Sequence, residues 1–216
     1  MSKSSRLRIT EIFYSLQGET RTAGWPTIFI RLTGCPLRCS YCDTEYAFQG
    51  GDWMEIDDIV ENIQQYNTSH VTVTGGEPLA QKNCLALLAR LCDLNYEVSL
   101  ETSGALSVKE VDSRVSRVVD VKTPGSGESD KNLYDNFALL NQHDQLKFVI
   151  CDRADYEWSK EIIEQYDLIN VCVCWFSSSF EQVDGVELAD WILQDQLKVR
   201  FQLQLHKILW ADEPGR

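Results

Sequence analysis

The sequence predicts an α/β protein: an open, partial parallel β/α barrel of about six units. Short apolar runs rich in Val and Ile alternate along the chain with longer segments whose apolar residues recur at helical spacing. Such alternation is typical of parallel strands joined by crossover helices, and about six units are too few to close an eight-stranded barrel. No internal repeat or Pro/Gly-rich linker divides the 216 residues, so we expect a single domain, 1–216.

Strands are expected where β-branched and other apolar residues follow one another over several positions. The segments expected as strands are 7–16, 27–33, 70–74, 97–101, 118–122, 144–150, 170–176 and 198–205. Helices are expected where apolar residues recur every three or four positions, as Ile56, Ile59, Val60 and Ile63 do. The segments expected as helices are 54–66, 79–94, 155–166 and 186–194.

This order of elements also predicts where a ligand binds. In parallel α/β folds, the ligand site lies beyond the carboxyl ends of the strands. Segments rich in small or polar residues directly follow four predicted strands: 34–44, 75–78, 102–104 and 123–125. Core packing alone gives no reason for all four to occur at strand ends, so we expect them to share one site.

Composition limits the classes of protein to which the chain can belong. It is 44% hydrophobic and 25% charged, which is ordinary for a soluble domain with a full core. The net charge is −13 and no run of clustered Lys and Arg occurs, so we expect no nucleic-acid partner. The N-terminus is polar, and no apolar run approaches the length of a membrane span. We therefore expect a cytoplasmic protein without a membrane partner, in which cysteines are ligands or core residues rather than disulfides.

Three cysteines, Cys35, Cys39 and Cys42, are spaced by three and then two residues. Three such thiolates can hold three corners of a [4Fe-4S] cluster and leave the fourth iron open to a small molecule, whereas a closed electron carrier fills all four corners with cysteine. A zinc site with a fourth ligand from elsewhere is the alternative, although no second CxxC-like pair is present. The remaining cysteines, expected as core residues, are Cys84, Cys92, Cys151, Cys172 and Cys174.

The spacing of the cysteines, with the aromatic Tyr41 just before the last one, resembles the signature of the radical S-adenosylmethionine (SAM) enzymes. In that family the open iron binds the amino and carboxylate groups of SAM, which breaks into methionine and a 5'-deoxyadenosyl radical. The segment Thr74–Pro78 resembles a second hallmark, a Gly-Gly-Glu loop whose backbone can approach SAM closely. At the end of a later strand, Lys122 is either solvated or in contact with SAM or a carboxylate.

Polar residues near the N-terminus suggest a substrate. Arg31 lies in an otherwise apolar strand, and a buried guanidinium needs an anionic partner. A substrate carboxylate and an internal salt bridge both meet that need. Gln17 and Glu19 offer an amide and a carboxylate that suit the edge of a guanine-like heterocycle, unless they only form a surface turn.

Together these motifs resemble the 7-carboxy-7-deazaguanine synthase family. The matching segments are Ser15–Glu19, Phe29–Arg31, Gly34–Thr44, Thr74–Pro78, Glu101–Gly104 and Gln204–Lys207. The resemblance implies conversion of 6-carboxy-5,6,7,8-tetrahydropterin to 7-carboxy-7-deazaguanine with loss of ammonia, in queuosine precursor biosynthesis. Hydrogen abstraction from C6 would start the reaction. The resemblance also implies a homodimer and a flavodoxin-like electron donor.

The same resemblance implies roles for individual residues. The cluster ligands would be Cys35, Cys39 and Cys42. The SAM contacts would be Tyr41, Cys42, Asp43, Gly76 and Lys122. The pterin contacts would be Leu16, Gln17, Gly18, Arg31 and Thr74, with Arg31 at the substrate carboxylate. Mg²⁺ would bind Thr44, with water and substrate supplying the other ligands.

Two departures from the family pattern affect the C-terminal third. Some members place the carboxylate of a C-terminal proline near the substrate, whereas this chain continues through Trp210–Arg216. His206 therefore either reaches the site or packs within a strand. The segment 176–180 lacks a proline that accompanies a SAM contact in the family, so no SAM contact is predicted there.

Three other functions compete with the synthase. A radical SAM activase, which makes a glycyl radical on a partner protein, would share the cluster and the glycine loop but would not need Gln17, Glu19 or Arg31. A zinc-stabilised binding module would have no catalysis. A degenerate family member would keep the fold without activity, although the intact cysteine triad and Arg31 argue against it.

Overall fold

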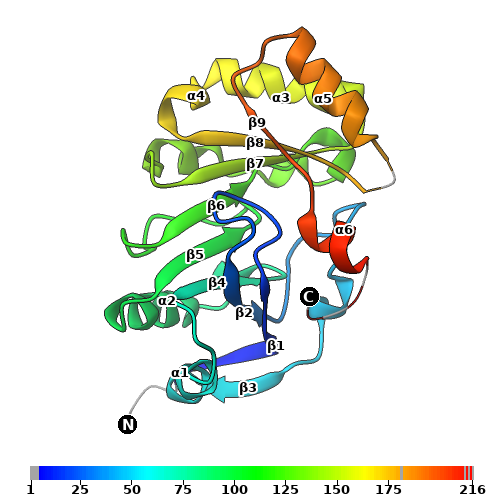
Figure 1. Ribbon diagram of the computed structural model, residues 1–216. Coiled ribbons are helices and arrows are strands. Elements are labelled where there is room, and N and C mark those ends of the chain that lie inside the picture. The colour runs from blue at the N-terminus through cyan, green and yellow to red at the C-terminus, as the bar shows by residue number, and fades with distance from the viewer. Residues whose placement is uncertain (1–4, 181, 212, 214, 216) are drawn as a thin grey trace.

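The computed structural model describes residues 5–180, 182–211, 213 and 215. They form one nine-stranded sheet in the order β3-β1-β2-β4-β5-β6-β7-β8-β9 (Figure 1). The strands are β1 Arg6–Leu16, β2 Pro26–Leu32, β3 Asp52–Glu55, β4 His70–Gly75, β5 Glu97–Thr102, β6 Ser116–Asp120, β7 Gln145–Ile150, β8 Val173–Ser178 and β9 Arg200–Gln202. The helices are α1 Ile56–Ile63, α2 Cys84–Asp93, α3 Arg153–Gln165, α4 Leu168–Val171, α5 Gly185–Gln194 and α6 Leu205–Trp210.

The sheet is mostly parallel and does not close. Each neighbouring pair from β2 and β4 through to β8 and β9 is parallel, which makes six parallel pairings. Strands β3 and β9 stand at the two ends, so the structure confirms the predicted open α/β architecture. The sequence analysis did not foresee that β1 pairs antiparallel with both β2 and β3.

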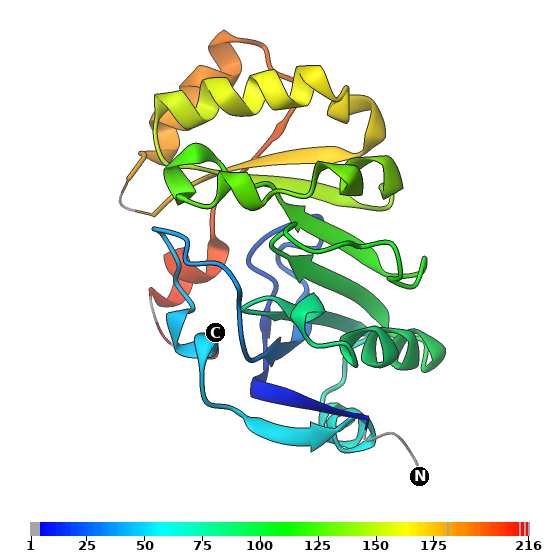
Figure 2. The ribbon, with the colours of Figure 1, turned by 180° about the vertical axis from the view of Figure 1, so that it is seen from behind.

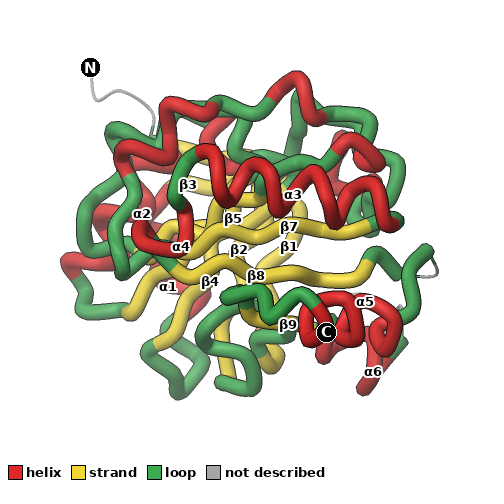
Figure 3. The backbone as a smooth tube through the Cα atoms, turned by 90° about the horizontal axis from the view of Figure 1, so that it is seen from above, coloured by secondary structure: helices red, strands yellow, loops and turns green. Residues whose placement is uncertain are grey.

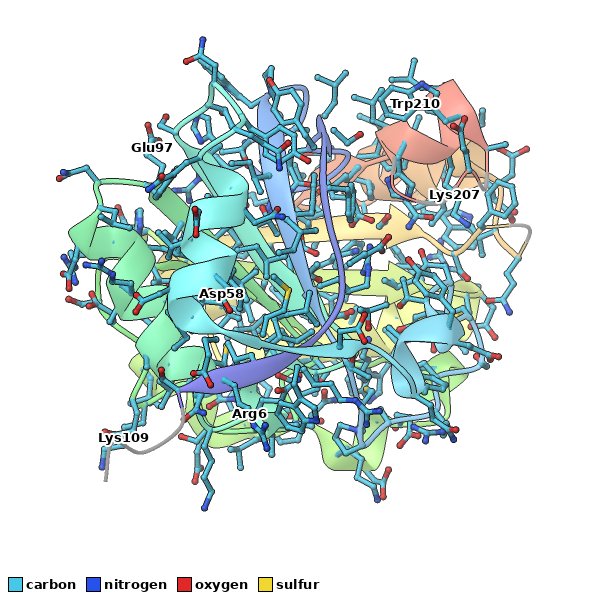
Figure 4. The ribbon with its side chains drawn as sticks, turned by 90° about the horizontal axis from the view of Figure 1, so that it is seen from below. Arg6, Asp58, Glu97, Lys109, Lys207 and Trp210 are labelled. Carbon is cyan, nitrogen blue, oxygen red and sulfur yellow. The ribbon has the colours of Figure 1, made fainter. Side chains whose placement is uncertain are left out.

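Helices α2 and α3 and the long loop after β2 lie on different sides of the sheet (Figures 1 and 2). Helices α2 and α3 pack on strands β5 and β7 along the outer face, as Figures 1 and 2 show. Seen from above in Figure 3, the strands form an inner layer that these helices flank. The long loop after β2 lies beside α6 on the other side (Figure 2). Figure 4, where Asp58 marks α1 and Lys207 and Trp210 mark α6, places these two helices on different sides of the strands.

Several predicted elements differ in their bounds from those observed. The helix expected from residue 79 begins at Cys84, after a 3-10 turn at Pro78–Ala80, and the strand expected over 118–122 lies at Ser116–Asp120. Residues 52–55 pair with β1 as strand β3, so the helix expected from residue 54 begins at Ile56. Residues 168–171 form α4 before β8 begins, although a strand was expected from residue 170. The strand expected over 198–205 ends at Gln202, and His206 lies on helix α6 rather than in a strand. The chain leaves the sheet there because the Leu205 amide donates to the Gly18 carbonyl, 3.0 Å away.

One core joins the sheet and the helices packed on it, and α6 contributes no buried residue to it. The apolar positions that predicted α1 are all buried, and Cys84, Cys92, Cys172 and Cys174 lie in this core as expected. Cys151, also expected in the core, is only partly buried, because it follows the end of β7. None of the helices formed by residues 5–180 and 182–211 is long and apolar enough to cross a membrane.

Candidate active site

A cavity of about 720 Å³ lies at the carboxyl ends of the parallel strands. Its wall combines the loop after β2 with the loops after β4, β5 and β6, the turn between β1 and β2, and helix α6. The residues to which the sequence analysis gave a site role all line it: Leu16, Gln17, Gly18, Arg31, Cys35, Cys39, Tyr41, Cys42, Asp43, Thr44, Thr74, Gly76 and Lys122. Segments from both halves of the chain therefore meet in one space.

The cysteine loop takes its shape from backbone hydrogen bonds. It starts at Gly34, whose φ of +99° is a conformation that favours glycine. The amide of Gly34 donates to the Ala47 carbonyl at 2.8 Å, and its carbonyl accepts from the Glu77 amide at 2.8 Å. Further along, the Cys42 amide donates to the Cys39 carbonyl at 3.2 Å and closes the turn between these two cysteines.

Gly76 lets the loop after β4 approach the cysteine loop closely. A Cβ atom at this position would lie 2.4 Å from the Gly34 carbonyl oxygen and 2.7 Å from the Cys35 Cβ atom. Neither distance leaves room for a side chain. Glycine at position 76 therefore keeps backbone, rather than side chain, next to the first cysteine.

Glu77 does not line the cavity, and its buried side chain instead holds two of the site's loops together. Its side chain is fully buried and accepts from the Thr102 hydroxyl at 2.9 Å and from the Ser103 amide at 2.7 Å. It also accepts from the Leu79 amide at 2.9 Å. One carboxylate thus joins the loop after β4 to the loop after β5, and a buried carboxylate with this many donors is well satisfied.

The three thiols of the cysteine loop suit a cluster better than a single ion. Burial raises the pKa of the Cys35 and Cys39 thiols, and the nearby Lys122 ammonium opposes that rise. Across the described residues, no group of three or more Cys, His, Asp or Glu side chains is arranged to hold one metal ion. A cubane cluster presents its irons at separate corners and needs thiolates that stand apart. Three thiols on one loop therefore suit a [4Fe-4S] cluster that keeps one iron open.

Lys122 lies near the cysteines, two residues beyond the end of β6. Its ammonium is 2.7 Å from Oδ2 of Asp120 and lies over the ring of Tyr41. Although burial works against the charged form, Asp120 holds the pKa of Lys122 well above its ordinary value. Within the described part of the chain, the other oxygen of Asp120 and the buried Tyr41 hydroxyl have no hydrogen-bond partner. This end of the cavity thus offers a fixed cation and unpaired polar atoms to a ligand.

Arg31 has an internal partner and is also open to the cavity. Its Nε atom donates to Oε1 of Glu11 at 2.7 Å, and the Tyr46 hydroxyl donates to the same oxygen at 2.8 Å. Among the residues that the structure describes, the terminal nitrogens of Arg31 have no hydrogen-bond partner. The internal salt bridge that the sequence left open is present, and it occupies only one of the three guanidinium nitrogens.

Gln17 is a buried connector rather than a residue of a surface turn. It is 3% exposed, and its amide nitrogen lies 3.2 Å from both the Thr72 hydroxyl and Oε1 of Glu101. The Thr74 hydroxyl donates to the other oxygen of Glu101 at 3.2 Å. Burial raises the pKa of the Glu101 carboxyl, and the negative charge of Glu19 adds to that rise.

Glu19 belongs to a buried ion pair that the sequence analysis did not predict. Its carboxylate contacts the ammonium of Lys147, a residue of β7, and accepts from the Gln204 amide at 3.0 Å. Although burial alone would raise it, Lys147 holds the pKa of Glu19 below its ordinary value. Lys147 interrupts an apolar strand just as Arg31 does, and that was the one signal that could have identified it.

The C-terminal helix completes this wall. A Cβ atom on Gly18 would lie 2.4 Å from Nδ1 of His206, so the turn after β1 and helix α6 touch closely. His206 lines the cavity, and burial lowers the pKa of its imidazole. Of the two alternatives for His206, the structure thus favours the one in which the side chain reaches the site.

Comparisons of the sequence and of the fold with known proteins point to the same family. Residues 29–122 match the model of the radical SAM superfamily. The chain is 45% identical to the 7-carboxy-7-deazaguanine synthase of Chlorobaculum tepidum over 97% of both chains. It is 44% identical to that of Koribacter versatilis, over 96% of this chain and 98% of the relative. The fold matches the crystal structure of QueE from Escherichia coli with a TM-score of 0.76 at 23% identity, over 95% of this chain and all of that one.

The comparisons also bear on the predicted cofactors. Enzymes of this kind use a [4Fe-4S] cluster, SAM and Mg²⁺, so the three cofactors expected from the sequence are confirmed at the level of the family. The extent of these matches leaves no large part of the chain unaccounted for. The chain belongs to the 7-carboxy-7-deazaguanine synthase family of radical SAM enzymes.

Proposed function

We propose that this enzyme converts 6-carboxy-5,6,7,8-tetrahydropterin to 7-carboxy-7-deazaguanine with release of ammonia. One observation carries the proposal: a single cavity contains both the three-cysteine loop and the open side of the Arg31 guanidinium. A carboxylated bicyclic substrate needs a cation at one end and polar groups along its ring edges. The relatives named above are synthases of the same product.

At the cofactor end, Cys35, Cys39 and Cys42 would hold the cluster. The residues that would hold SAM are Tyr41, Cys42, Asp43, Gly76 and Lys122. When bound, the cluster and SAM supply a 5'-deoxyadenosyl radical, which abstracts hydrogen from the substrate. The bare backbone at Gly76 and the unpaired oxygens of Tyr41 and Asp120 provide polar contacts for this ligand.

At the substrate end, Arg31 would bind the substrate carboxylate through its terminal nitrogens, while Glu11 holds the guanidinium from behind. Gln17 and Thr74 would lie along the pterin, with Leu16 and Gly18 completing the wall. The Thr44 hydroxyl would bind Mg²⁺, which commonly takes its remaining ligands from water and substrate. Fixing both ligands in one cavity is the main contribution of the protein, because radical transfer depends on the distance between the reacting carbons.

The electron that the cluster needs would come from a flavodoxin-like protein. We place the enzyme in the cytoplasm as a homodimer that acts on a small molecule, with neither nucleic acid nor membrane as a partner. The family resemblance supports the donor and the dimer, and the acidic composition supports the absence of nucleic acid.

Anaerobic turnover tests the proposal. Reconstituted protein is incubated with SAM, dithionite, Mg²⁺ and the carboxytetrahydropterin, and the products are weighed by mass spectrometry. We expect a product lighter than the pterin by ammonia, with SAM not consumed stoichiometrically. Cleavage of SAM with the pterin untouched would reject the substrate and favour an activase. A colourless, zinc-bound protein that cleaves no SAM would reject the radical enzyme altogether.

A further inference from the structure

The cysteine loop is held from two sides, and one of them involves residues without an assigned role. On the first side, the Gly34 carbonyl accepts from the Glu77 amide, close to Cys35. On the second side, Arg38 and Ser40, which flank Cys39, are bound to the segment 123–128. We call this segment after β6 the outer loop.

Three hydrogen bonds join the cysteine loop to the outer loop. The Ser40 amide donates to the Ser126 carbonyl at 3.0 Å, and the Ser40 hydroxyl donates to the Gly125 carbonyl at 2.7 Å. The Arg38 amide donates to Oε1 of Glu128. Since Ser40 lies between Cys39 and Cys42, the position of both thiols depends on where the outer loop stands.

The outer loop in turn is fixed by Asp155, in the first turn of α3. This side chain is 1% exposed. Its Oδ1 accepts from the Gly125 amide at 2.8 Å, and its Oδ2 lies 2.8 Å from the Thr123 hydroxyl and 3.0 Å from the Cys151 amide. The amino end of a helix favours a negative charge, so the carboxylate suits this position.

Gly125 links the two sets of contacts within one residue. Its amide binds Asp155 and its carbonyl binds Ser40. A Cβ atom on Gly125 would lie 2.5 Å from Oδ2 of Asp155 and 2.8 Å from the Cys151 Cβ atom. The packing around Gly125 therefore leaves no room for a side chain. A displacement of the carboxylate is therefore passed on to the cysteine loop through a single residue.

We propose that Asp155 is a positioning residue for the iron–sulfur cluster. It acts through Gly125 and Ser40 and sets the position of Cys39 and of the turn to Cys42, the residues that would hold the cluster. The inference rests on the proposed role of Cys35, Cys39 and Cys42 as cluster ligands. The mechanical link from Asp155 to Ser40 can be tested without a cluster.

The first test is hydrogen exchange in the metal-free protein carrying Asp155→Asn. The amide that replaces one carboxylate oxygen would face a backbone donor, so the outer loop loosens. We expect the Arg38 and Ser40 amides to exchange at least about tenfold faster, while the Glu77 amide at the other anchor keeps its rate. Equal acceleration at Ser40 and Glu77, or none at Ser40, overturns the proposal.

The matched control for this test is Asp144→Asn. Asp144 is also fully buried and accepts backbone donors, from the Arg117 amide at 3.0 Å and the Asn141 amide at 2.9 Å, but it lies at the start of β7. Its substitution lowers global stability without touching the outer loop. We expect it to leave the ratio of the Ser40 and Glu77 exchange rates unchanged. A shift of this ratio in the control as large as that in Asp155→Asn overturns the specific link.

The second test uses the protein loaded with iron and sulfide. In Asp155→Asn, release of iron to a chelator should be about tenfold faster, and the EPR spectrum of the reduced cluster with SAM should change. Both should stay as in the wild type in Asp144→Asn. If iron release and the EPR spectrum of Asp155→Asn match those of the wild type, Asp155 does not position the cluster and the proposal is overturned.

A second variant decides the matter if Asp155→Asn does not fold. Ser40 is exposed, so Ser40→Ala should fold normally and lose only the bond to Gly125. We expect iron release about threefold faster, and a double variant that is less than additive because both changes break one connection. Unchanged release in Ser40→Ala overturns the proposal. A protein that takes up no cluster at all rejects the proposed function, while the exchange experiment still decides the link from Asp155 to Ser40.

Discussion

The two ends of the cavity are built from different interactions. At the cluster end, the cysteine loop is held largely by backbone amides and carbonyls, with the buried carboxylates of Glu77 and Asp155 behind it. At the substrate end, the wall consists of paired charges, Arg31 with Glu11 and Lys147 with Glu19. The cysteine loop is thus held mainly by hydrogen bonds to backbone groups, whereas the substrate end holds charges that a ligand can contact.

This difference matches what each end is proposed to bind. A cluster needs thiolates at set positions, and backbone hydrogen bonds in a packed loop supply such positions, while the ion pair of Lys122 and Asp120 at this end lies outside the loop. A carboxylated substrate needs a charge, and a buried charge is tolerable only when it has a partner in the empty site. Substitutions at the two ends should therefore have different effects on cluster loading, stability and substrate binding. The following substitutions test this, from the largest expected effect to the smallest.

The largest effect is expected for Cys39→Ala, at the cluster end. With two cysteines left, the cluster has too few ligands, so SAM cleavage should fall below detection. Iron content and the absorbance of the reconstituted protein measure the loss. Cys92→Ala is the matched control, because Cys92 is a core residue, and it should keep a wild-type cluster. A Cys39→Ala protein with full SAM cleavage would show that another residue completes the site.

The next largest effect, a loss of stability, is expected for Lys147→Met at the substrate end. The substitution leaves Glu19 buried without its cation, which typically costs about 3–5 kcal/mol. Urea unfolding of the metal-free protein measures the change in the free energy of unfolding. The double variant with Glu19→Gln should recover most of the loss, since no unpaired charge remains. A single variant that loses under about 1 kcal/mol would mean that water reaches Glu19.

Arg31→Gln should weaken substrate binding and leave the cluster end unchanged. Loss of a charge-assisted contact to a carboxylate is worth about 1.5–3 kcal/mol, so the KM for the pterin should rise by about 10- to 150-fold. Tyr46→Phe is the control: it removes a bond to Glu11 but keeps the guanidinium, and should change KM by less than about threefold. SAM binding should be the same in both variants. An unchanged KM in Arg31→Gln would remove Arg31 from the substrate contacts.

The site was predictable from sequence because its residues follow strands that could be recognised locally. Parallel strands bring their carboxyl ends together, so the cysteine loop and the loop after β4 had to meet, whatever their separation in the chain. Arg31 also stood out, because a charge in an apolar strand needs a partner. The identity of that partner, Glu11, depends on the antiparallel pairing of β1 with β2, which the local pattern did not specify.

What could not be predicted depends on contacts between distant segments. Residues 52–55 form β3 only because β1 offers a free edge, and α6 forms where the chain meets the turn at Gly18. Lys147, like Arg31, is a charged residue in an apolar strand. No recognised motif surrounds it, so its ion pair with Glu19 was not predicted. Asp155 looked like an ordinary helix-start residue, and its contacts to Gly125 appear only in three dimensions.

The smallest effect is expected for Glu101→Gln, as a dependence of stability on pH. Burial raises the pKa of the Glu101 carboxyl above its ordinary value, so the folded state binds this proton more tightly than the unfolded state does. The resulting stabilisation is fully present below the unfolded pKa and is lost as the pH rises through the folded pKa.

Glutamine cannot ionise, so Glu101→Gln should lose this pH dependence. Relative to the wild type, the variant should become more stable as the pH rises from 5 to 8, because only the wild type loses the stabilisation from the protonated Glu101. Urea unfolding of the metal-free proteins at both pH values measures the difference. If the variant and the wild type differ by the same amount at the two pH values, Glu101 is already ionised at pH 5 in the folded protein. The substrate end would then hold two buried carboxylates, Glu19 and Glu101, and the cations of Lys147 and Arg31 would both stabilise the charge of Glu101.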